Sequence, residues 1–138
     1  MSEILARLLA IYHFAKDIHY SARGESFYGI HLLMDRIADG IHGQMDSINE
    51  VCYLGKDKEA PMSTIILQSA MAKMPEMWSG NRENLEELCD LIGGTIENII
   101  EMIQNGSDNM TSPEASLLDE IAQSLMLKKG LITRSLKE

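Results

Sequence analysis

Apolar residues recur at every third or fourth position along most of the chain, which is the period of an amphipathic α-helix. The first such stripe predicts a helix over residues 2–22, followed by a break at Arg23-Gly24-Glu25. Within this break, Gly24 suits a left-handed cap and Ser26 suits the start of the next helix. A second stripe continues for about 27 residues to Leu54-Gly55 and predicts one long helix. We expect the glycines inside it to mark close approach of other helices; these are Gly29, Gly40 and Gly43.

The rest of the sequence predicts one short helix and two more long ones. The short apolar helix is expected from Ser63 to about Lys73 and should be covered rather than solvated. The third long helix should end at Asn105-Gly106, and Pro113 fits the first position of the fourth. Because the short helix lies in a substantial connection between the second and third long helices, the pattern predicts an all-α four-helix bundle with a long crossover.

Composition agrees with a helical fold. The chain has 138 residues, of which 45% are hydrophobic and only 5% aromatic, and ten methionines supply part of the apolar volume. A chain of this length has enough residues for one core, so we expect a single domain over residues 1–138. The two cysteines, Cys52 and Cys89, are widely spaced in helical segments and are expected to be reduced.

Charge and hydropathy limit the classes of function. Twenty-one acidic residues against twelve basic ones give a net charge of −9, which disfavours sequence-independent DNA binding by the single chain. The sequence contains no apolar run long enough for a membrane span, and Glu3 and Arg7 interrupt the only stretch that could serve as a signal peptide. We therefore expect a soluble, cytoplasmic protein without membrane contact.

A polar stripe beside the apolar face of the second helix carries the candidate chemistry. His31 and Asp35 form one i, i+4 pair on it, and Asp46 and Glu50 form another, so each pair can converge on one cation. Imidazole and carboxylate ligands together suit Fe(II), Mn(II) or Zn(II).

The two pairs cannot share a cation within one helix, because the rise per residue places them about 22 Å apart. An antiparallel two-fold packing of this helix against its copy would bring His31 and Asp35 of one subunit beside Asp46 and Glu50 of the other, and would create two equal sites. His19, at the end of the first helix, could then supply a third ligand from the first subunit.

Other readings of these residues stay open. A single histidine at an apolar stripe is often a hydrogen-bonded core residue, and an acidic stripe is often a solvated helix face. His13 lies off the stripe and is expected at the surface. Asp39 and His42 could form the acid-x-x-His element of a metal site within a bundle, although the sequence lacks the Glu-x-x-His pair that such a site needs on two helices.

Residues 19–55 resemble the ferroxidase region of the Dps proteins, the dodecameric mini-ferritins named for DNA protection in starved cells. In the family's pattern, eleven residues separate two histidines, and three residues separate the second histidine from an Asp. Ten residues then separate this Asp from a second Asp, and three separate the second Asp from a Glu. This pattern is matched without a gap by the following residues: His19, His31, Asp35, Asp46 and Glu50. The resemblance implies a ferritin-like bundle and a site at a two-fold interface. The histidines and the first Asp would come from one subunit, and the second Asp and the Glu from the other.

The resemblance further implies a ferroxidase, in which Fe(II) is oxidised by hydrogen peroxide or dioxygen and stored as ferric mineral inside a hollow dodecamer built from two-fold dimers. His19, His31 and Glu50 are the implied direct ligands, and Asp35 and Asp46 either bind the metal or orient its ligands. Zn or Mn could occupy the site in the isolated protein. Candidates for acidic pores at the three-fold axes, around the start of the fourth helix, are Asp108, Glu114 and Asp119.

Two departures from the family pattern change the expectations. Tyr20 stands where the family usually has Trp, so an oxidisable aromatic is kept beside the first histidine. The chain begins almost at its first helix, without the Lys-rich tail through which many members bind DNA, and DNA binding is therefore not expected. The alternative is a non-enzymatic helical assembly or DNA-compacting protein, in which the polar stripe forms a dimer interface or holds a structural metal.

Overall fold

A computed structural model describes residues 1–106 and 109–137, and all of the regular structure in these ranges is helical. The elements are α1 (Ser2–Ser21), α2 (Phe27–Ala38), α3 (Ile41–Cys52), the 3₁₀ turn η1 (Leu54–Lys56), α4 (Ser63–Met71), α5 (Asn81–Asn105) and α6 (Ser112–Leu136). The predicted all-α class is confirmed, as are the first, third and fourth long helices.

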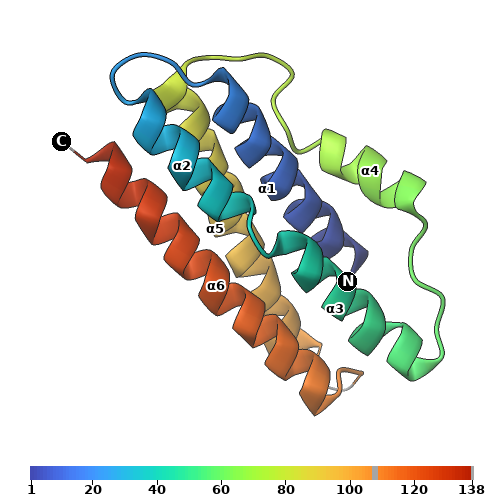
Figure 1. Cartoon of the computed structure of the whole chain (residues 1–138). Coiled ribbons are helices and arrows are strands. Elements are labelled where there is room, and N and C mark those ends of the chain that lie inside the picture. The colour runs from blue at the N-terminus through green and yellow to red at the C-terminus, as the bar shows by residue number, and fades with distance from the viewer. Residues whose placement is uncertain (107–108, 138) are drawn as a thin grey trace.

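The long helices form a bundle in which α1, the α2–α3 pair, α5 and α6 lie side by side (Figure 1). The α2–α3 pair and α5 run in the same direction, so α3 ends at the opposite end of the bundle from the start of α5 (Figure 1). The connection between them must therefore span the length of the bundle, and it carries α4 along the outside of α1. The predicted long crossover with its short helix is confirmed.

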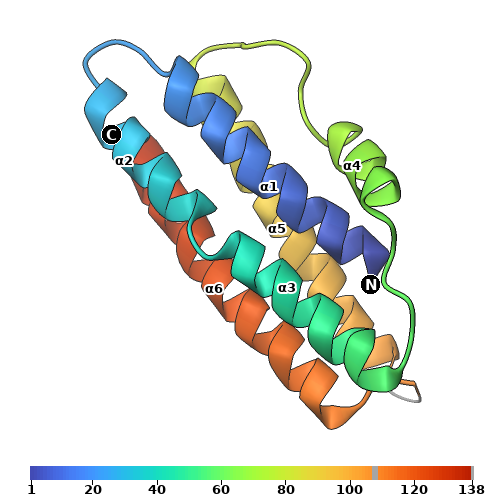
Figure 2. The ribbon, with the colours of Figure 1, turned by 45° about the vertical axis from the view of Figure 1, so that its right-hand side comes forward.

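The prediction of one uninterrupted second helix is wrong. The chain leaves the helical conformation at Asp39 (φ −61°, ψ 136°) and turns at Gly40 (φ 79°, ψ −9°), which separates α2 from α3 (Figure 2). Hydrophobic periodicity did not reveal the break because the buried stripe continues across it, through Ile37 in α2 and Ile41 in α3. Glycine suits this position because it adopts a left-handed conformation without the steric cost that a Cβ brings.

The close approach of another helix that is expected at the glycines of this segment does not occur within the single chain, over the residues that the structure describes. A Cβ placed on Gly29, Gly40 or Gly43 would meet no atom within 4 Å in the chain. Close approach occurs in α5 instead, where a Cβ on Gly93 would lie 3.2 Å from Cε of Lys129 in α6. Gly24 has a positive φ of 89°, but it does not cap α1: the C-cap is Ala22, and Gly24 lies two residues further on, in the turn before α2.

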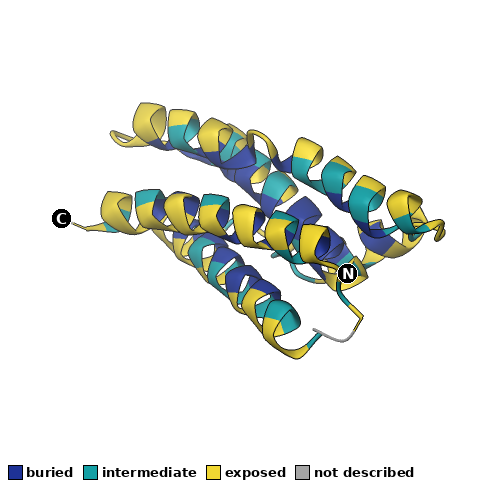
Figure 3. Ribbon diagram, turned by 90° about the horizontal axis from the view of Figure 1, so that it is seen from below, coloured by how far each residue is buried: buried dark blue, intermediate teal, exposed yellow. Residues whose placement is uncertain are grey.

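The core is built mainly from aliphatic residues. The buried stretches lie on the sides of the helices that are turned toward one another (Figure 3). The crossover helix α4 buries Ile66 and Ala70 but leaves Ile65 58% and Met71 71% exposed. The expectation that α4 is covered is therefore met on its inner face only, and its outer face is apolar and open in the single chain.

The start of α6 is fixed by a capping box. The Thr111 hydroxyl accepts from the Glu114 N–H at 3.3 Å, and the Glu114 carboxylate accepts from the Thr111 N–H at 3.1 Å. The same carboxylate accepts from Nζ of Lys56 at 3.0 Å and is only 5% exposed. The Glu114 carboxylate is therefore buried and occupied by contacts that stabilise the fold. Its assignment to an acidic pore is wrong. Asp119 is exposed, and Asp108 lies outside the described residues.

Cys52 and Cys89 are both free, as predicted. Within residues 1–106 and 109–137, no helix has the length and hydropathy needed to cross a membrane.

Candidate metal centre

Two histidines meet where the end of α1 and the first turns of α2 lie side by side. The rings of His19 and His31 stack, with centroids 3.6 Å apart and planes 17° apart. Tyr20 contacts the His19 ring edge-on at 5.0 Å, and Phe27 lies 5.1 Å from the His31 ring. The short turn after α1 returns the chain so that α2 packs against it, which places these residues together.

Reciprocal hydrogen bonds fix the orientation of both imidazoles. Nδ1 of His19 lies 2.7 Å from the carbonyl oxygen of His31, and Nδ1 of His31 lies 2.8 Å from the carbonyl oxygen of His19. A carbonyl oxygen can only accept, so each Nδ1 carries the proton and donates. In the neutral ring, Nε2 is then left with a free lone pair, which is the form that binds a metal ion.

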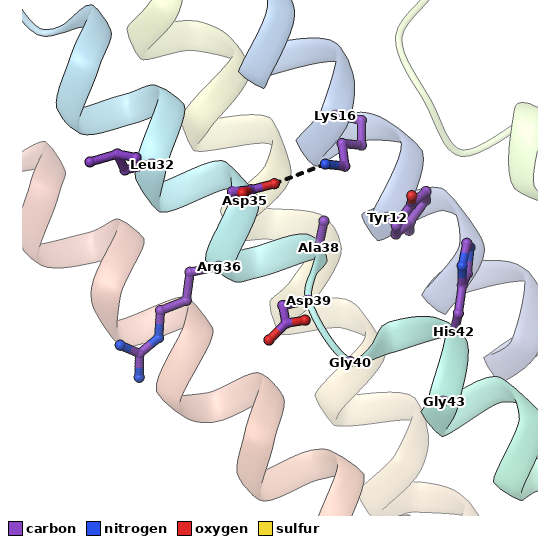
Figure 4. A pocket seen from close by; sticks show the side chains of 10 residues that line it. All are labelled: Tyr12, Lys16, Leu32, Asp35, Arg36, Ala38, Asp39, Gly40, His42 and Gly43. Carbon is purple, nitrogen blue, oxygen red and sulfur yellow. Dashed lines mark hydrogen bonds and ion pairs between the residues drawn. The ribbon is translucent and has the colours of Figure 1, made fainter.

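Asp35 lies one helical turn after His31 and is held by a cation. Its Oδ1 accepts from Nζ of Lys16 at 2.9 Å, across the groove between α1 and α2 (Figure 4). The hydrogen bond from Lys16 and its positive charge lower the pKa of Asp35 below its ordinary value, and the two histidines contribute in the same direction. A cation that binds Asp35 must therefore compete with Lys16 or share the carboxylate with it.

Asp46 and Glu50 form the second pair, one turn apart on the exposed face of α3. Asp46 raises the pKa of the Glu50 carboxyl above its ordinary value, through a hydrogen bond that one protonated carboxyl must donate and through like-charge repulsion. A bound cation would relieve this repulsion and allow both groups to ionise. The pair is therefore suited to bind a divalent ion.

An open pocket of about 560 Å³ lies along α1 beside the α2–α3 break (Figure 4). Lys16 and Asp35 line one part of it, and Tyr12 and His42 line another, with their ring centroids 4.1 Å apart. His42 also borders a neighbouring pocket of about 400 Å³ that contains Asp46. Two neighbouring hollows that share His42 thus lie beside Asp35 of α2 and Asp46 of α3.

The chain divides its candidate ligands into two half-sites, defined here as the histidine half-site (His19, His31 and Asp35) and the carboxylate half-site (Asp46 and Glu50). In the part of the chain that the structure describes, no three His, Cys, Asp or Glu side chains are grouped closely enough to hold a metal ion. The alternative Asp39–His42 element is not formed, because Asp39 lies in the helix break and the His42 ring packs on Tyr12. His13 is exposed, as predicted.

Lys16 is not among the residues predicted for the site, although its spacing from His19 could have indicated a place beside it. It precedes His19 by three residues and therefore lies on the same face of α1. The spacing of Tyr12 fits the apolar stripe of α1, but its ring is only half-buried and faces the pocket.

An all-helical bundle with one long crossover and an outlying short helix defines a ferritin-like fold. Comparison with solved structures identifies the form of that fold as the one found in Dps proteins. Over 99% of its length the chain is similar to Dps from Thermosynechococcus elongatus, with a TM-score of 0.89, 16% identity and coverage of 87% of that chain. No family model matches the sequence.

Two further Dps structures are similar over 99% of this chain. Dps from Vibrio cholerae O1, a member of a broad superfamily of ferritin-like diiron-carboxylate proteins, gives a TM-score of 0.83 at 14% identity and covers 86% of that chain. Dps from Microbacterium arborescens in the high iron form gives a TM-score of 0.81 at 16% identity and covers 90% of that chain. At these identities the similarity establishes the fold, and the chemistry has to be argued from the residues.

Proposed function

We propose that this chain is a ferroxidase that oxidises Fe(II) at a centre shared between two subunits and stores the ferric product inside a hollow oligomer. The observation that carries the proposal is the pair of incomplete half-sites. The histidine half-site presents two imidazoles in the tautomer that binds metal, and the carboxylate half-site holds two like charges that a cation would stabilise.

A two-fold axis would complete both centres at once. The histidine half-site lies on α2 and the end of α1, and the carboxylate half-site lies on α3; α2 and α3 succeed each other along one side of the bundle (Figure 1). Antiparallel packing of this side on its copy would therefore bring each half-site opposite its complement. Exposed apolar side chains near the same side supply surface for such an interface, among them Leu32 at 51% and Tyr28 at 69% exposure. Six such dimers, each chain forming one domain, make the proposed dodecamer.

Each group has a defined part in the reaction. Nε2 of His19 and Nε2 of His31 bind Fe(II) as neutral donors, and Glu50 of the second subunit supplies a negative ligand. Asp46 shares the charge with Glu50, and Asp35 binds or orients the ion after Lys16 gives way. The proposed ligand set thus combines neutral and anionic donors, and the anionic ones favour the higher charge of Fe(III).

The overall step balances with hydrogen peroxide as the oxidant. Two Fe(II) ions lose one electron each, and the O–O bond of one peroxide accepts both electrons and breaks. With two water molecules the products are two ferric oxyhydroxide units and four protons. Because both electrons go to one peroxide, no hydroxyl radical leaves the centre. Dioxygen can serve as a slower oxidant. The similar Dps from Microbacterium arborescens, solved in a high iron form, supports iron as the cargo.

The test is iron oxidation by matched variants. Apoprotein is loaded with Fe(II) without oxygen, peroxide is added, and ferric absorbance is followed in wild type and in the variants His31→Ala and Asp46→Ala. Both variants should oxidise Fe(II) about tenfold or more slowly than wild type, because each loses a group that binds or orients the metal ion. His13→Ala is the control, because His13 is an exposed histidine on α1 outside both half-sites. Equal rates in all four proteins would overturn the proposal and favour a structural assembly.

Size measurement tests the assembly separately. Gel filtration with light scattering should give about 185 kDa, twelve copies of the 15.4 kDa chain. A stable monomer would contradict the shared centre.

A further inference from the structure

The break between α2 and α3 is closed by a lysine from another helix. In an uninterrupted helix, the Asp39 carbonyl would accept the N–H of the residue four positions later. Here that carbonyl accepts from Nζ of Lys128 at 2.8 Å, and Lys128 belongs to α6. The extended conformation of Asp39 and the positive φ of Gly40 direct the chain around this contact.

Lys128 is an unusual choice for this place because it is almost completely buried. Its exposure is 7%, and lysine is rarely found at such a value without a partner. Burial lowers its pKa below the ordinary lysine value, with Arg36 acting in the same direction and Asp39 opposing it. An ammonium group at this depth is retained at a cost, which indicates that the contact with the break has a specific use.

The break separates the two half-sites. His31 and Asp35 lie on α2 before it, and Asp46 and Glu50 lie on α3 after it. The angle between α2 and α3 therefore decides whether both half-sites can face their complements across one two-fold axis. Both helices also pack on α6, so a contact from α6 to the break can fix that angle.

We propose that Lys128 is a positioning residue for the shared metal centre, and this rests on the proposed function. Through its hydrogen bond to the Asp39 carbonyl, it holds α2 and α3 at the one angle that brings the histidine half-site and the carboxylate half-site of opposite subunits together. Lys128 binds no metal itself. Its effect is exerted on the geometry of α2 and α3, which carry all of the proposed ligands except His19 on α1.

The experiment measures Co(II) binding to the assembled protein, by the visible absorption of the bound ion and by titration calorimetry. Lys128→Met keeps the length and removes the donor, and Lys128→Arg keeps a donor and the charge. Lys129→Met is the matched control, since Lys129 is the exposed neighbour on the same helix and contacts α5 at Gly93. Circular dichroism and gel filtration verify that each variant is folded and assembled.

We expect Lys128→Met to weaken Co(II) binding by about tenfold, with Lys128→Arg close to wild type and Lys129→Met unchanged, as for lost outer-sphere support of a metal site. A merely structural lysine would lower the melting temperature without changing the affinity of the folded protein. Co(II) binding by Lys128→Met equal to that of wild type would overturn the proposal. If wild type itself bound no Co(II), the proposed function would fail with it.

A second variant covers the case in which Lys128→Met does not fold. Asp39→Ala combined with Gly40→Ala replaces both residues of the break by a strong helix former and favours a continuous helix. It should weaken Co(II) binding by about tenfold with Lys128 still present. Wild-type affinity in this variant would show that the angle at the break does not set the centre, and would overturn the proposal.

Discussion

Each proposed centre draws its ligands from two subunits, so two variants that are each slow alone should restore part of the activity when they assemble together. His31→Ala damages only the histidine half-site, and Asp46→Ala damages only the carboxylate half-site. In a mixed dimer, one centre receives both defects and the other receives none. Random pairing makes half of the dimers mixed, and half of the centres in those are intact, so the rate should return to about a quarter of the wild-type value.

In the assay, the two variants carry different affinity tags, and equal amounts of both are unfolded and refolded together. The mixed assembly is then purified through both tags in turn. Peroxide-dependent iron oxidation is compared with that of each variant refolded alone. The control is His31→Ala with His19→Ala, because both defects fall in the histidine half-site and no pairing yields an intact centre. No recovery in the first mixture, or equal recovery in the control mixture, would refute a centre shared across a two-fold axis.

Three further predictions concern single residues. Lys16→Met should tighten Co(II) binding by about threefold or more, because it frees the Asp35 carboxylate from a 2.9 Å ion pair; weaker binding in titration calorimetry would contradict this competition. Glu114→Gln should lower stability at pH 7 by about 2 kcal/mol in urea denaturation, since it removes the charge that Lys56 and the α6 cap hold. Burial raises the pKa of Glu114, but the hydrogen bonds from Thr111 and Lys56 outweigh burial, and the net pKa is lowered. The stabilisation is therefore present above the ordinary glutamate pKa and is lost as the pH falls through the lowered pKa; a difference between the two proteins that does not shrink as the pH is lowered would disprove the assignment. Leu88→Ala should cost about 2–5 kcal/mol, because Leu88 is fully buried in α5, and an unchanged melting temperature would show that this part of the core repacks.

The division of the ligands into two half-sites should make iron oxidation depend on the concentration of the protein. An isolated subunit holds two imidazoles on one side and two carboxylates on another, and neither set forms a group of three in the described residues. Iron oxidation should therefore depend on assembly, and activity at high dilution should fall as the oligomer dissociates.

The ion pair with Lys16 makes Asp35 less available to a metal ion than the two imidazoles of the same half-site. Each imidazole uses Nδ1 for a backbone carbonyl and so keeps Nε2 for a metal ion, whereas Asp35 is already paired with Lys16 at 2.9 Å. Binding of the first Fe(II) ion should accordingly depend most on the histidines and on the carboxylates of the second subunit. Asp35 would then contribute mainly when Lys16 moves aside.

Most of the helices and the spacing of the candidate ligands could be predicted from the sequence alone. These features depend on contacts between residues three or four positions apart, which are present in any helix that the local pattern favours. The buried stripe of α1 and the i, i+4 relation of Asp46 to Glu50 are of this kind. The long crossover could also be predicted, because its length and its polar flanks are visible in the sequence.

Three features could not be predicted from the sequence: the break at Gly40, the proton positions on His19 and His31, and the ion pair of Asp35 with Lys16. Each depends on a group from another helix, and for the break that group is Lys128, distant in sequence. Periodicity reports which face of a helix is apolar and not which donor or charge the fold brings to it. The reach of a lysine from α6 and the return of the chain after α1 are therefore properties of the packed bundle alone.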